Sequence, residues 1–130
     1  MENLVYFSFY EKDLKTVLAL KRKVRDPNYE NLNFKVKRLL RRWDTDDISA
    51  MQKAIARAMK GATRTIVLVG NGTYKSKWLP EEVKMSRDAG NPVYAVRLEG
   101  TYGAKPTCLS NANIHLYDWG EEALQNLATW

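Results

Sequence analysis

The stretch RTIVLVG, residues 64–70, decides the fold class of this chain. Between Arg64 and Gly70 every residue is apolar or β-branched, without the polar alternation of a strand that has one wet face. Such a run is typical of a central strand in a parallel sheet that is covered on both faces. We therefore expect a parallel sheet with helices packed against both of its sides.

The segments on either side of this strand have helical patterns. Residues 44–61 (DTDDISAMQKAIARAMKG) predict a helix that is capped by Asp44 or Thr45. Residues 79–90 (LPEEVKMSRDAG) predict a second, shorter helix, with Leu79 as its cap residue and Pro80 in the first helical position. Earlier in the chain, NFKVKRLL at 33–40 fits either a short strand or the start of a helix, and we favour the strand.

Strands alternate with helices along the rest of the chain. The other elements that we predict are a strand at 4–9, a helix at 11–24, a strand at 91–100, a loop at 99–111, a strand at 113–119 and a helix at 120–130. This order predicts a single α/β domain, residues 1–130, whose sheet is mostly parallel. Ligands of such sheets bind beyond the carboxyl ends of the strands.

The net charge of +6 comes largely from two basic clusters, KRKVR at 21–25 and KVKRLLRR at 35–42. The clusters fit either solvated faces or a field that attracts an anionic partner such as a nucleotide. We do not expect nucleic acid as the partner, because no aromatic residues are interleaved with the charge and no recognition motif is present.

The sequence predicts a cytoplasmic protein without a membrane span. Its first residues, MENLVYFSFY, lack the basic start and the long apolar run of a signal peptide or membrane helix. The chain has one cysteine, Cys108, and one histidine, His115, which are too few for a zinc site of the usual kind. We therefore expect no metal and no resident cofactor.

Two loops follow predicted strands and are the candidate binding segments. In SFYEKD the residues Ser8, Phe9 and Tyr10 stand at a strand end, where aromatic rings form either core or a platform for a base. Asp13 either caps the next helix or pairs with a base. The second loop, NGTYKSK at 71–77, offers backbone N–H groups and lysines to a phosphate, although it lacks the Gly-Lys-Ser/Thr run of a P-loop.

The adjacent carboxylates Glu81 and Glu82 have two explanations. Acidic residues in the first turn of a helix stabilise it through the helix dipole, and Trp78 before the helix can pack on Val83 as a hydrophobic staple. Alternatively, one carboxylate faces the ligand-binding cleft beyond the carboxyl ends of the strands, and Trp78 forms part of the wall of that cleft. Successive helical residues are rotated by roughly 100°, so the two glutamates cannot face the cleft equally. The Glu82 face continues through apolar and small residues, so we expect Glu82 to point inward.

The segments VYFSFYEKD (5–13), TIVLVGNGTYKSKWLPEEV (65–83) and AGNPVYAVRLEG (89–100) resemble TIR-like domains, above all those of bacterial Thoeris anti-phage defence. Trp78 and Glu82 match the Trp-x-x-x-Glu pattern of that family. The chain departs from the family by its second glutamate and by lacking the usual glycine-bearing motif after the second strand, where Trp43 and Asp44 could substitute for it.

The resemblance implies a flavodoxin-like, three-layer sandwich and an enzyme that cleaves NAD. NAD is then the substrate, nicotinamide is released, and a cyclic ADP-ribose isomer serves as a diffusible signal to an effector protein. The resemblance also implies self-association. It assigns the catalytic role to Glu82, and the substrate-binding residues that we predict are Ser8, Phe9, Tyr10, Asp44 and Trp78. Because other TIR domains are adaptors, a non-catalytic protein-interaction module is the alternative.

Overall fold

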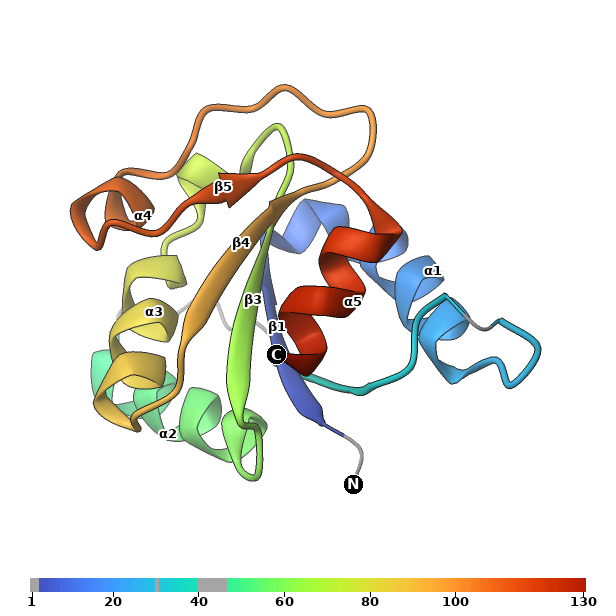
Figure 1. Ribbon diagram of the computed structural model, residues 1–130. Helices are drawn as coiled ribbons and strands as arrows, with labels where there is room; N and C mark the ends of the chain where they lie inside the picture. Colours follow the sequence, from blue (N-terminus) through green and yellow to red (C-terminus); the bar gives the residue numbers. More distant parts are fainter. Residues whose placement is uncertain (1–2, 30, 40–46) are drawn as a thin grey trace.

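Strand β3 (Arg64–Val69) is the middle strand of a five-stranded sheet, and all six of its residues are buried (Figure 1). The computed structural model describes residues 3–29, 31–39 and 47–130. The strand order is β2-β1-β3-β4-β5, and every pairing is parallel. The other strands are β1 (Leu4–Phe9), β2 (Lys35–Arg38), β4 (Val93–Arg97) and β5 (Leu116–Tyr117). The predicted parallel α/β sheet is therefore confirmed, and the ambiguous segment at 33–40 contains a strand.

Helices cover both faces of the sheet, giving three layers (Figure 1). One layer contains α1 (Leu14–Arg25) and α5 (Glu121–Thr129), whose apolar side chains pack on Phe7, Ile66 and Leu68. The opposite layer contains α2 (Ile48–Met59), α3 (Leu79–Asp88) and the short α4 (Thr107–Asn111). The alternation of side chains along each parallel strand supplies both faces with apolar residues.

Three details differ from the predicted elements. The N-cap of α2 is Asp47, whose side chain accepts a hydrogen bond from the Ala50 N–H, so the prediction of Asp44 or Thr45 as the cap is wrong. Helix α4 lies within the segment predicted as a loop. Helix α3 begins at Leu79, one residue earlier than expected, and Trp78 is its N-cap residue. None of the helices in the described ranges has the length and apolarity needed to cross a membrane.

The burial of β3 generates a stability prediction. Leu68 is fully buried in the core between the sheet and α1 and α5. We expect Leu68→Ala to lower the free energy of unfolding by about 2–5 kcal/mol, because it removes buried apolar volume and leaves a cavity. Urea unfolding, monitored by circular dichroism, measures the change in the free energy of unfolding. Ile48→Ala is the control, since Ile48 is 57% exposed and its truncation leaves no cavity; equal losses in the two variants would contradict the assignment.

Candidate active site

Strand β1 presents two different sets of side chains to its two faces. Val5, Phe7 and Phe9 pack in the core beside α1 and α5. Because side chains alternate along a strand, Tyr6 and Ser8 point to the opposite face, toward α3. Both are buried there. The candidate site is built on this second face.

Glu82 lies against that face of β1 and is completely buried. The hydroxyl of Tyr6 donates a hydrogen bond to Glu82 Oε2 at 2.5 Å. The Glu82 N–H donates to the Trp78 carbonyl, which is the first bond of the α3 ladder, so the carboxylate lies near the positive end of the helix dipole. A buried carboxyl group needs such donors, because burial without hydrogen bonds is strongly unfavourable.

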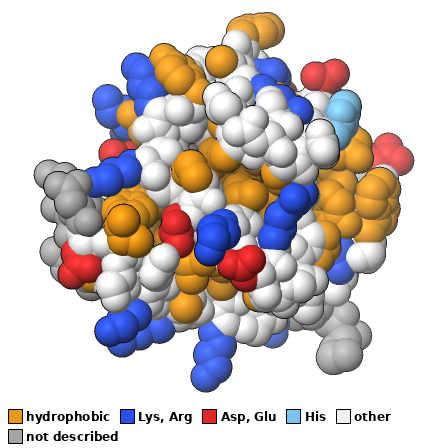
Figure 2. Space-filling view, turned by 90° about the vertical axis from the view of Figure 1, so that its left-hand side faces the viewer, with side chains coloured by type: hydrophobic (Ala, Val, Ile, Leu, Met, Phe, Trp, Pro, Cys, Tyr) orange, Lys and Arg blue, Asp and Glu red, His pale blue; other side chains and the backbone are white. Residues whose placement is uncertain are grey.

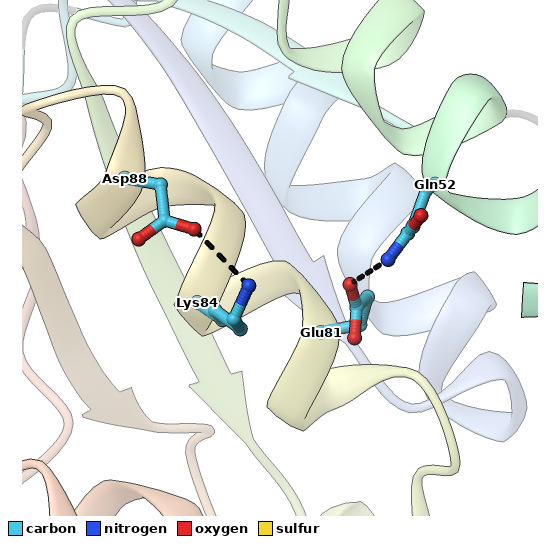
Figure 3. A network of polar contacts seen from close by, with 4 residues as sticks. All are labelled: Gln52, Glu81, Lys84 and Asp88. Atoms are coloured by element: carbon cyan, nitrogen blue, oxygen red, sulfur yellow. Dashed lines mark hydrogen bonds and ion pairs between the residues drawn. The ribbon is translucent and has the colours of Figure 1, made fainter. Parts of the chain in front are cut away.

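The spacing of α3 turns Glu82 inward and Glu81 outward. Leu79, Glu82, Val83 and Ser86 form the buried face of the helix, at helical spacing. The expectation that Glu82 faces inward is thus confirmed. Figure 3 shows the outer side, where Glu81 Oε1 accepts a 2.7 Å hydrogen bond from Gln52 Nε2 of α2. Glu81 therefore connects two helices rather than standing free in solvent.

Trp78 is 7% exposed and belongs to an apolar cluster with Leu39, Met51 and Ile55. Val83 belongs to a separate cluster beneath α3 and α4, so the two residues do not form the predicted staple. The indole instead anchors the start of α3 to α2 and to the end of β2. Because Trp78 precedes Glu82 by one helical turn, this anchor fixes the position of the first turn of α3.

The loops after β1 and β3 touch at two glycines. The ring of Tyr10 lies against Gly72, where a Cβ atom would be 2.7 Å from Tyr10 Cε2. A Cβ atom at Gly70 would lie 2.4 Å from Asp13 Oδ2. Both separations are shorter than atoms tolerate, so glycine at these positions allows the two strand-end loops to meet.

Two buried polar atoms near this junction have no hydrogen-bond partner among the described residues: Ser8 Oγ and Asp13 Oδ2. Burial also raises the pKa of Asp13 above the usual value of about 3.8. Unpartnered buried polar groups are uncommon in folded proteins and are found at functional sites. We therefore take the carboxyl ends of β1 and β3 as the candidate binding position.

The structure separates the predicted substrate-binding residues into groups. Ser8 and Trp78 lie on the Glu82 side of the sheet, whereas Phe9 is buried in the core on the opposite side. Tyr10 lies at the strand-end loops. Asp44 lies outside the described residues.

Sequence reasoning missed two components of this region. Tyr6 was not predicted as a partner of Glu82, although a hydroxyl inside a buried strand signals the need for a polar partner. The second is the loop after β4, in which the Tyr102 N–H donates to Asn71 Oδ1 at 2.8 Å. Tyr102 is 90% exposed beside the β3 loop. No local sequence signal joins residues that are 31 positions apart.

Seen from the side of α2 and α3, the surface mixes hydrophobic side chains with charges of both signs (Figure 2). Glu82 contributes nothing to this surface because it has no exposed area. As described, the carboxylate is therefore closed to solvent. Chemistry at Glu82 requires a rearrangement that admits a ligand to it.

The comparisons with known proteins identify the family and the fold. The model of the family described as "Thoeris protein ThsB, TIR-like domain" matches residues 6–102, a range that includes Tyr6, Trp78 and Glu82. The chain belongs to the Thoeris ThsB TIR-like family. This ThsB TIR-like chain is also similar in structure to the TIR domain of the Toll-related receptor TRR-2 from Hydra magnipapillata. The TM-score is 0.61 at 16% identity, over 95% of this chain and 90% of that one. The search of curated proteins found no match.

The Tyr6–Glu82 bond generates a stability prediction. We expect Tyr6→Phe to lower the free energy of unfolding by about 1–3 kcal/mol, because the buried carboxyl group loses a donor. Glu82→Gln should cost less, since an amide oxygen still accepts from Tyr6 at nearly unchanged volume. Urea unfolding of the two single variants measures both losses. No loss in Tyr6→Phe, or a loss in Glu82→Gln as large as that in Tyr6→Phe, would contradict this role of the bond.

The partly buried carboxyl group of Asp13 generates a pH prediction. Its raised pKa means that folding favours the protonated form, so its contribution to stability is complete below about pH 3.8 and is lost as pH rises through the folded-state value. We expect Asp13→Asn to raise the melting temperature at pH 7, where the wild type buries a charge. The difference should shrink toward pH 3. A difference that is independent of pH would contradict the assignment.

Proposed function

We propose that this protein is a TIR-like enzyme that cleaves NAD, releases nicotinamide and makes a cyclic ADP-ribose isomer as a signal in anti-phage defence. The observation that carries the proposal is Glu82: a buried carboxylate within the segment that matches the family, four residues after Trp78 and hydrogen-bonded to Tyr6 of β1. The proposed setting is the cytoplasm, where the diffusible product reaches an effector protein.

The proposed chemistry begins with cleavage of the bond between nicotinamide and ribose. The electron pair of that bond leaves with the neutral nicotinamide, and the ribose becomes oxocarbenium-like. The carboxylate of Glu82 stabilises the developing positive charge and accepts hydrogen bonds from the ribose hydroxyls. An internal nucleophile of the remaining ADP-ribose then forms the new bond to the ribose carbon and gives the cyclic product. Water in its place gives the hydrolysed product.

Turnover requires that the substrate can reach Glu82. The carboxyl group has no exposed area in the described arrangement, so substrate can reach it only after the surrounding segments move. We propose that self-association of the chain drives this opening. Ser8, Tyr10 and Asp13, with their positions at the end of β1, are then the groups placed to receive the polar parts of NAD.

A non-catalytic interaction module is the second candidate, and one observation favours it. The bond from Tyr6 gives Glu82 a structural role that needs no substrate. In that case Glu82 holds α3 on the sheet, and the function of the protein lies in its surfaces.

Nicotinamide release separates the two candidates. We expect the wild-type protein to release nicotinamide from NAD, with a specific activity that rises with protein concentration. We expect Glu82→Gln to lower the rate at least about 100-fold, because it removes the charge that stabilises the transition state. Chromatography of the reaction mixture measures nicotinamide and the cyclic or linear product.

Glu81→Gln is the matched control, since it makes the same chemical change one residue away and faces Gln52 instead of β1. It should retain activity. Full activity of a folded Glu82→Gln variant would refute the mechanism. Absence of turnover by the wild type at every concentration would favour the interaction module.

A further inference from the structure

A groove of about 670 Å³ runs along the open edge of the sheet, between α1, β2 and α2. Strand β2 is the edge strand, paired on its inner side with β1. Leu39 lines the groove and also packs with Trp78, whereas Glu82 is not part of the lining. The groove is thus lined by other residues than the candidate active site, although Leu39 connects it to Trp78.

Five cationic side chains line the groove: Lys21, Lys37, Arg38, Lys53 and Arg57. The only acidic residue among the described lining is Asp47, whose side chain already accepts a hydrogen bond from the first turn of α2. Among the described lining residues, cations thus outnumber carboxylates five to one. A concave surface of this kind concentrates anions, because its walls focus the field of the cations.

The cations repel one another in the free protein. Lys53 and Arg57 are exposed and four residues apart on α2, which places like charges on one helix face. Burial, followed by the positive charges of Arg38 and Arg25, lowers the pKa of Lys21. Arg38 Nε is buried without a hydrogen-bond partner among the described residues. A bound anion would relieve the repulsion among these cations.

The floor of the groove is apolar. Ala50, Ala54 and Ala58 recur at every fourth position of α2, and Val36 lines the strand side. Small side chains at this spacing leave the space that forms the groove. The volume lies in the range of pockets for organic ligands, which is about 300–1,000 Å³ and far more than a lone phosphate fills.

We propose that this groove binds a small organic polyanion of the nucleoside polyphosphate class. Its phosphates pair with the lysines and arginines, whose guanidinium groups match phosphate oxygens in geometry. Its base covers the alanine floor. The proposal does not depend on NAD cleavage, since it uses none of the residues around Glu82.

Isothermal titration calorimetry with ADP tests the proposal, with adenosine and pyrophosphate as separate ligands. The variant is Lys53→Glu combined with Arg57→Glu; both positions are exposed, so the fold is retained. The control is Lys84→Glu combined with Lys105→Glu, which changes the net charge equally at exposed positions outside the lining. Circular dichroism and thermal unfolding verify that all variants are folded.

We expect the wild type to bind one ADP per chain at physiological salt, more tightly than pyrophosphate, and not to bind adenosine. The groove variant should bind ADP at least about tenfold more weakly, because it loses two charge-assisted contacts. The control should change affinity less than about twofold.

Three outcomes would overturn the proposal. The first is absence of ADP binding by the wild type. The second is an equal loss of affinity in the control, which would indicate a general effect of net charge. The third is loss of ADP binding in Glu82→Gln with binding retained in the groove variant, which would place ADP in the candidate active site.

Discussion

The middle strand of the sheet has no exposed side chain, and this burial on both faces organises the whole molecule. Because β3 offers apolar residues to both sides, the chain must place helices above and below it. With both faces covered, the carboxyl ends of the strands are where loops can approach one another. The contacts of Gly70 with Asp13 and of Gly72 with Tyr10 occur there. The position of the candidate site at the strand ends is therefore a consequence of how the core packs.

Glu82 has a structural role in the fold, and under the proposed function it also has a chemical one. Helix α3 presents one face to the sheet, and a carboxylate stands on that face beside Leu79 and Val83. Tyr6 donates a hydrogen bond to this carboxylate and so lowers the free-energy cost of burying it. The same bond holds the carboxylate in a fixed position, which is what electrostatic stabilisation of a transition state requires. A conformational change that exposes Glu82 must therefore break or rearrange a contact that stabilises the fold.

Periodicity in the sequence was sufficient to predict the parallel sheet, the alternation of strands and helices along the chain and the inward direction of Glu82. These features depend on local patterns of apolar residues. The cap of α2 was misplaced because several acidic residues precede the helix, and the pattern does not rank them. Tyr6 and the Asn71–Tyr102 contact were missed because they join segments far apart in the chain. The sequence predicted the basic clusters but not the groove. The shape of the groove depends on the alanines of α2 that face the edge strand, and these are far from β2 in the chain.

The strand order has a consequence for how the chain folds as it is synthesised. Strand β1 is synthesised first, yet in the folded sheet it lies between β2 and β3, whose residues come about 30 and 60 positions later. Until Val69 has left the ribosome, the buried side chains of β1 lack one of the two strands that flank them. Such long-range parallel pairing slows folding and leaves an apolar edge exposed to other chains. A nascent chain halted before residue 69 therefore exposes apolar residues of β1 that the complete sheet covers, and such surface favours aggregation.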